Sequence, residues 1–133
     1  MKGIELLEQN PESAKLICSY YLEIMIESLK DEGLPEDFKE SIREQGIDNE
    51  KIGAILDGNP RNLFDFFDSH NMYITVTCFS DGSFSYSIIA DIGTSGTSEV
   101  YKTRKEADKN AVETAIKQLE LTLTKSVSDK ENS

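Results

Sequence analysis

The hydrophobic pattern of this 133-residue chain changes its period near Met72. Before that position, apolar residues recur every three or four positions, as they do in helices that bury one side. After it, Ile74, Val76 and Cys78 alternate with other residues, which is the two-residue period of a β-strand with one buried face. The change predicts an α+β fold, in which an N-terminal helical region packs with a three-stranded antiparallel sheet and a C-terminal helix.

The helical region begins with a clear helix start. Asn10 can accept a backbone hydrogen bond as the N-cap residue, and Pro11 suits the first helical position. Over residues 11–30 the polar positions form only a narrow stripe, so we expect this helix to be mostly buried. Glycine and proline signals predict two shorter helices, over 35–46 and 49–57.

The second half predicts a hairpin, a third strand and a last helix. An Asp-Gly turn at 81–82 joins the first two strands, and Gly93–Gly96 turns the chain into a third strand, Thr97–Tyr101. Thr103 and Glu106 form a capping box, and the helix that follows carries alanines every four residues. The pattern ends after Leu123. We therefore expect one domain over 1–123, made of an acidic helical half (1–71) and a βββα half (72–123), with a flexible polar tail over 124–133.

Charge separates the two halves. The chain has 14 Lys and Arg against 25 Asp and Glu, so its formal net charge is -11 and its pI is near 4.5. This balance excludes a protein that holds nucleic acid through bulk positive charge. Residues 1–71 contain 7 basic and 16 acidic residues, whereas residues 102–133 contain 7 basic and 6 acidic residues.

Localisation and cysteine state follow from simple patterns. The chain has no run of about 18 apolar residues, which a membrane span would need. Its opening residues lack the apolar stretch of a secretory signal, so we expect a cytoplasmic protein. Cys18 and Cys78 are far apart in apolar-patterned segments, which predicts buried free thiols.

Side chains suited to catalysis or metal binding are sparse. The chain has one histidine, His70, at a predicted junction between helix and strand, and no Cys and His cluster of the kind that binds zinc. Gly93–Gly96 leads into a strand, whereas phosphate-binding loops lead into a helix. We therefore expect no catalytic residues, no cofactor, no metal ion and no enzyme activity.

The start of the last helix carries a family resemblance. Thr103-Arg104-Lys105-Glu106-Ala107 resembles the Ser-Lys-Lys-x-Ala start of the last helix in the double-stranded RNA-binding domain, and Ala111 matches a later packing alanine. Asp108 departs from the pattern, because the family has a basic residue there. The resemblance covers about residues 72–123 and implies an α-β-β-β-α fold that binds phosphates across a groove. The residues that would bind nucleic acid are Lys102, Arg104, Lys105 and Lys109.

The acidic half favours a different function. A small, strongly acidic chain without cofactors resembles in general character the accessory proteins of bacteriophages and mobile elements. Some of these inhibit host nucleic-acid-binding proteins by presenting carboxylates where phosphates would lie. Our leading hypothesis is a non-catalytic binding or regulatory protein whose helical half engages a basic protein partner. The candidate contact residues are Glu36, Asp37, Glu40, Glu44, Asp48, Glu50, Asp57, Asp65 and Asp68.

Three alternatives remain open. The first is the double-stranded RNA-binding type of module, which the acidic first half disfavours. In the second, residues 46–58 read DNA, since they resemble the turn and recognition helix of repressor-type helix-turn-helix proteins, although acids occupy most of the positions that would meet DNA. The third is self-association through the expected strand 97–101 or through the aromatic residues of 64–67, for which burial in the core is the competing explanation.

Overall fold

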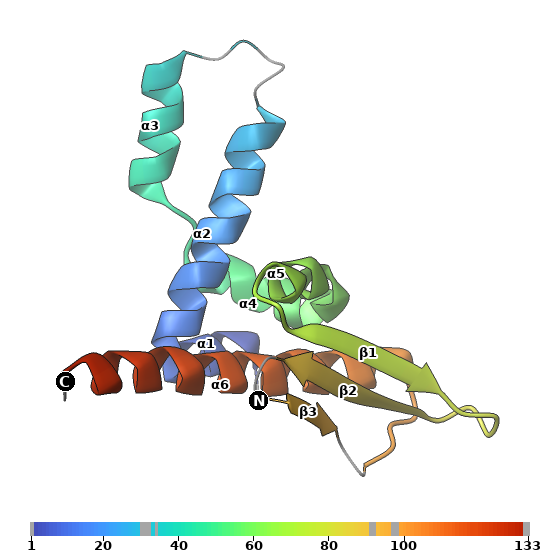
Figure 1. Cartoon of the computed structure of the whole chain (residues 1–133). Coiled ribbons are helices and arrows are strands. Elements are labelled where there is room, and N and C mark those ends of the chain that lie inside the picture. Colours follow the sequence, from blue (N-terminus) through green and yellow to red (C-terminus); the bar gives the residue numbers. More distant parts are fainter. Residues whose placement is uncertain (1, 30–32, 34, 91–92, 97–98, 132–133) are drawn as a thin grey trace.

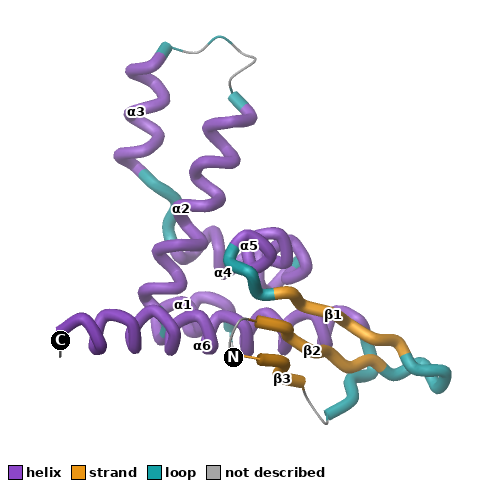
Figure 2. Tube along the Cα trace, viewed as in Figure 1, coloured by secondary structure: helices purple, strands orange, loops and turns teal. Residues whose placement is uncertain are grey.

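The computed structural model describes residues 2–29, 33, 35–90, 93–96 and 99–131, and its fold is α+β, as expected (Figure 1). The helical half contains α1 (Gly3–Gln9), α2 (Pro11–Ser28), α3 (Glu36–Gln45), α4 (Asn49–Gly58), the 3-10 turn η2 (Pro60–Leu63) and α5 (Phe64–Ser69). The second half contains β1 (Tyr73–Cys78), β2 (Phe84–Ala90), β3 (Gly93–Gly96) and α6 (Arg104–Glu131) (Figure 2).

The strands form one antiparallel sheet in the order β1-β2-β3. Ile74 lies opposite Ile88 and Val76 lies opposite Tyr86, so these side chains share one face of the sheet. That face packs on α6, because the Tyr86 hydroxyl lies 2.8 Å from Oγ1 of Thr114. The predicted alternation and hairpin of β1 and β2 are confirmed.

The third strand is placed differently from the prediction. β3 is Gly93–Gly96, the segment expected to be a turn, and its first residue lies opposite Ala90. Gly93 has a φ of 124°, which L side chains rarely adopt, and Gly93–Gly96 pairs antiparallel with the end of β2. Of the expected strand 97–101, Tyr101 forms an isolated bridge with Phe84, and residues 97 and 98 lie outside the described residues.

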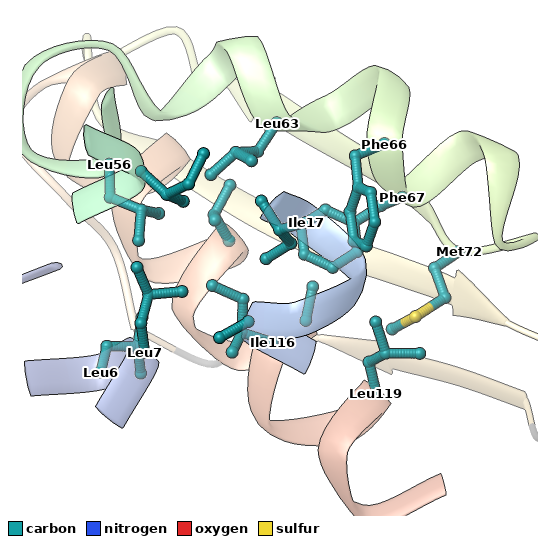
Figure 3. Packing of buried hydrophobic residues seen from close by; sticks show 14 of the residues in the cluster. Leu6, Leu7, Ile17, Leu56, Leu63, Phe66, Phe67, Met72, Ile116 and Leu119 are labelled. Atoms are coloured by element: carbon teal, nitrogen blue, oxygen red, sulfur yellow. The ribbon is translucent and has the colours of Figure 1, made fainter. Parts of the chain in front are cut away.

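Buried side chains from both halves form one cluster (Figure 3). Phe66 and Phe67 of α5 are fully buried and lie beside Ile17 of α2, which assigns this part of the aromatic segment to the core. The predicted alanine stripe of α6 is also fully buried at its first three positions. The core residues labelled in Figure 3 are Leu6, Leu7, Ile17, Leu56, Leu63, Phe66, Phe67, Met72, Ile116 and Leu119.

The start of α2 is capped by another helix, not by Asn10. The Asn10 side chain is buried and donates a hydrogen bond to the Leu6 carbonyl oxygen (2.8 Å). The carboxylate of Glu120, on α6, instead accepts hydrogen bonds from the backbone N–H groups of Glu12 (3.1 Å) and Ser13 (2.7 Å). A carboxylate suits the positive end of a helix, so this contact fixes α2 across α6.

The last helix is longer than the sequence pattern predicts. α6 continues past Leu123 to Glu131, where we expected a flexible polar tail. The apolar pattern ends at Leu123, but the segment that follows, to Glu131, contains no glycine or proline, and it contains two lysines and one glutamate, which are good helix formers. The pattern therefore marked the end of the buried part of the helix, and the helix itself extends further.

Candidate functional site

The C-terminal half of α2 and all of α3 stand away from the rest of the molecule as a pair of antiparallel helices, here called the arm (Figure 1). No residue of α3, which is described in full, is buried. The prediction that the first long helix is mostly buried is wrong for much of its second half, where Ile24 and Met25 are exposed, although Ile26 between those exposed residues and the helix end is buried. The contacts of α2 with the core cluster run from Ala14 to Tyr21.

The arm carries the first four predicted acids. Glu36, Glu40 and Glu44 follow one another at intervals of four residues, and Asp37 lies beside them, so all four share one side of α3. Two of the carboxylates are in ion pairs: Glu36 with the half-buried Lys39 (3.3 Å) and Glu40 with Arg43 (2.7 Å). Asp37 and Glu44 are exposed and have no ion-pair partner among the described residues.

Large apolar side chains are exposed on the same arm. Phe38 of α3 is 50% exposed, Ile24 of α2 is 47% exposed, and Met25 of α2 is 38% exposed. The guanidinium of Arg43 links the two helices, since its Nε lies 3.6 Å from Oε1 of Glu23. The arm therefore combines carboxylates with apolar surface that no described part of the chain covers.

The other predicted acids are distributed over α4 and α5. Asp48 is the N-cap of α4 and accepts a hydrogen bond from the Lys51 N–H (3.1 Å). Glu50 lies in the first turn of α4, and Asp65 and Asp68 lie on α5; all three are exposed. The structure thus spreads the nine candidates over three helices. The four on α3 share one side of that helix, and Asp65 and Asp68 share one side of α5.

Asp57, the last acid of the set on α4, holds three elements together. It accepts a hydrogen bond from the Gly3 N–H (2.9 Å) at the start of α1 and pairs with Nζ of Lys109 on α6 (3.2 Å). Desolvation raises the pKa of Asp57, but the Gly3 N–H, Lys109 and Lys2 outweigh it and hold this pKa below its usual value. Asp57, a candidate for binding a basic partner, and Lys109, a candidate for binding nucleic acid, therefore form an ion pair with each other.

The remaining basic candidates lie where α6 starts, close to the β1–β2 hairpin. The backbone groups of Tyr101 and Phe84 exchange two hydrogen bonds, and the Arg104 guanidinium lies 5.3 Å from the centre of the Phe84 ring. Lys102, Arg104 and Lys105 are all exposed. Asp108, the position that departs from the family pattern, is buried and paired with Arg61 of η2.

A groove that the sequence did not predict lies where the arm leaves the body. It has a volume of about 790 Å³, and we call it the corner groove. Its lining includes Leu16, Tyr20, Ile24, Glu23 and Glu27 of α2, together with His70, which follows α5. The spacing of these α2 residues places them on one side of the helix, and that spacing could have indicated a shared surface. Sequence reasoning missed it because the whole apolar set of α2 was expected in the core.

The cysteines are less buried than predicted. Cys18 is half-buried and its thiol lies 3.7 Å from Oδ1 of Asn49, whereas Cys78 is exposed at the end of β1. Burial, with a smaller effect from Asp48, raises the pKa of the Cys18 thiol. Cys78 is the last residue of β1 and lies beside the hairpin loop, so an apolar pattern did not ensure its burial.

Neither metal chemistry nor a known relative is indicated. Within the described ranges, no three His, Cys, Asp or Glu side chains are grouped so that they could hold a metal ion. None of the helices, over the residues that were placed, has the length and hydropathy to cross a membrane. Comparison with family models, curated proteins and solved structures finds no match.

Proposed function

We propose that the chain is a non-catalytic binding protein whose acidic arm engages a basic protein partner. One observation carries the proposal: α3 buries none of its residues, places four carboxylates on one side and leaves Phe38, on another side of the same helix, half-exposed. A helix that contributes nothing to the core is not explained by folding alone. Exposed aromatic side chains among charges are typical of surfaces that bind proteins.

The charge density on α3 supports a partner that binds nucleic acid. From Glu36 to Glu44 the helix rises about 12 Å, and its four carboxylates follow at uneven intervals of about 1.5, 4.5 and 6 Å along the axis. Phosphates on one strand of duplex DNA are spaced about 3.4 Å apart along its axis, so about 12 Å of that strand carries a similar number of negative charges. A basic groove shaped for phosphates would therefore meet a similar density of negative charge on α3, although not the same regular spacing.

The ion pairs on α3 do not oppose this function. Exposed pairs such as Glu40 with Arg43 contribute only about 0–1 kcal/mol, so cations of a partner can replace them at little cost. Charge alone gives fast but salt-sensitive association. Phe38 and Met25 supply apolar contact area, which gives lasting binding once the two surfaces meet.

The proposal is tested by capture of the partner with tagged full-length chain, followed by elution in steps of increasing salt. Asp37→Asn/Glu44→Gln removes two exposed charges from the arm. Glu5→Gln/Glu8→Gln removes two exposed charges from α1 and is the matched control. We expect a basic protein that elutes as salt rises, is lost with the arm variant and is kept by the control. Equal capture by both variants, or a partner that is not basic, would contradict the proposal.

A nucleic-acid module of the double-stranded RNA-binding type is the second candidate. It is favoured by three exposed cations, Lys102, Arg104 and Lys105, that lie next to the hairpin. It is disfavoured by the internal pairing of Lys109 and by the net charge of -11. A mobility-shift titration with duplex RNA and duplex DNA at low salt tests it. A shift that Arg104→Glu/Lys105→Glu abolishes and Lys15→Glu/Lys51→Glu leaves would favour this candidate.

A further inference from the structure

We infer that the corner groove receives a cationic amphipathic helix. This inference rests on the proposed function, because it names the segment of a basic partner that would bind and the place where it binds. The groove lies between α2 and the end of α5, whereas the carboxylates of α3 belong to the other helix of the arm. A partner could therefore contact both.

The apolar lining suits a helix in length and spacing. Leu16, Tyr20 and Ile24 recur every four residues, so their row extends about 12 Å along α2. Two turns of a helix extend about 11 Å and present apolar side chains at a matching spacing. Ile24 lies at the outer end of the row, and 47% of it is exposed among the described residues.

The charges around the groove select a cationic occupant. Glu23 and Glu27 lie within the same side of α2, and no lysine or arginine is among the described residues that line the groove. Glu23 also pairs with Arg43 of α3 (3.6 Å), but the Glu23 side chain is 63% exposed, so a cation of a partner can replace this contact at little cost. Carboxylates thus border the groove along α2.

These features exclude the other obvious occupants. A nucleic acid would bring phosphates towards Glu23 and Glu27, and an acidic helix would meet the same repulsion. A highly charged basic loop without apolar side chains would leave the row of Leu16, Tyr20 and Ile24 uncovered. A helix with apolar residues on one side and lysine or arginine on its flanks satisfies both requirements.

The test uses labelled synthetic peptides and fluorescence anisotropy with the full chain. The probe is a Leu/Lys peptide that places leucine at i, i+4 and i+7 and lysine on the flanks. One control is a scrambled peptide of the same composition, and the other replaces every lysine with glutamate. We expect the Leu/Lys helix to bind at least tenfold more tightly than either control. Equal binding of the scrambled peptide would show attraction by net charge alone and would overturn the inference.

Variants locate the binding surface. Ile24→Lys places a positive charge at the end of the groove, and Ile89→Lys does the same on the sheet at a residue of nearly equal exposure, 47% against 48%. We expect Ile24→Lys to weaken binding of the Leu/Lys peptide at least tenfold and Ile89→Lys to leave it within twofold. Glu23→Gln/Glu27→Gln, which adds no bulk, should also weaken it. Equal effects of Ile24→Lys and Ile89→Lys, or no effect of the glutamate variant, would overturn the inference.

The outcomes separate this inference from the proposed function. If Asp37→Asn/Glu44→Gln abolishes capture of the basic partner while Ile24→Lys changes neither peptide nor partner binding, the proposed function holds and the groove inference fails. If Ile24→Lys abolishes peptide binding but the α3 variant leaves partner capture unchanged, the groove inference holds and the arm proposal fails.

Discussion

Arg61 and Asp108 form a bidentate ion pair that joins η2 to α6. Nε of Arg61 lies 3.0 Å from Oδ2 of Asp108, and Nη2 lies 2.9 Å from Oδ1. Only 7% of the Asp108 side chain is exposed. The acid that departs from the basic pattern of the RNA-binding family therefore has a structural partner, so its presence reflects packing of α6 against the helical half.

Arg61→Ala should destabilise the fold, because it leaves a buried carboxylate without its partner. Loss of one member of a buried pair costs about 3–5 kcal/mol, and since Arg61 is 44% exposed we expect about 2 kcal/mol. Urea unfolding followed by circular dichroism measures this. Lys117→Ala, which breaks only the exposed pair with Glu113, should change the free energy of unfolding by less than about 0.5 kcal/mol. Similar losses in the two variants would contradict the buried pair.

Glu120→Ala should weaken the attachment of α2 to α6. The variant removes the acceptor of two backbone N–H groups at the start of α2, and loss of such a cap costs about 1–2 kcal/mol. Glu120→Gln retains one amide oxygen, so it should lose less stability than Glu120→Ala. Thermal unfolding of both variants checks this order. A fully stable Glu120→Ala variant would show that Asn10 or solvent caps α2 instead.

Two glycines of α4 should respond to alanine in opposite ways. A Cβ on Gly53 would lie 2.8 Å from the Ile4 backbone nitrogen, where α1 crosses α4, so Gly53→Ala should cost about 1–3 kcal/mol. A Cβ on Gly58 would meet no atom within 4 Å, so Gly58→Ala should be neutral or stabilise the helix by up to about 1 kcal/mol. Urea midpoints compare the two variants, and destabilisation of equal size would contradict the close helix crossing.

Asp57 should make stability depend on pH in the acid range. Its pKa in the folded state is below the unfolded value, so the folded state binds this proton less readily. The stabilisation from Asp57 is therefore complete above the unfolded pKa of about 4 and is lost as the pH falls through the lower folded value.

Asp57→Asn removes this contribution, so the variant should lose less stability than the wild type between pH 7 and pH 3. Urea unfolding at both pH values measures the difference, which we expect to be about 1 kcal/mol or less because the site is partly exposed. A wild type and variant with parallel pH profiles would show that the contact with Lys109 and Gly3 does not form in solution.

Local patterns in the sequence were enough to predict the α+β class, the β1–β2 hairpin and the burial of Phe66 and Phe67. They failed where distant segments decide the outcome. The N-cap role assigned to Asn10 is taken by Glu120, which is more than a hundred residues away along the chain. The small Gly53 is required by a helix crossing that no local spacing reveals.

The candidate site shows the same limit. The acidic side of α3 could be predicted from the sequence, because the four-residue interval between Glu36, Glu40 and Glu44 places them on one side of a helix. It could not show that the second half of α2 leaves the core, since a helix with a narrow polar stripe predicts burial whatever lies around it. The exposure of Ile24 and the corner groove both follow from that departure, so both required the arrangement of the helices in space.

Amide hydrogen exchange of the chain bound to its captured basic partner tests the central claim most directly. The account predicts that the partner slows exchange in α3 and in the second half of α2, and that the start of α6 and the β1–β2 hairpin exchange as they do in the free chain. Protection confined to residues 99–110 and the hairpin, with α3 unchanged, would contradict the claim that the acidic arm is the binding surface.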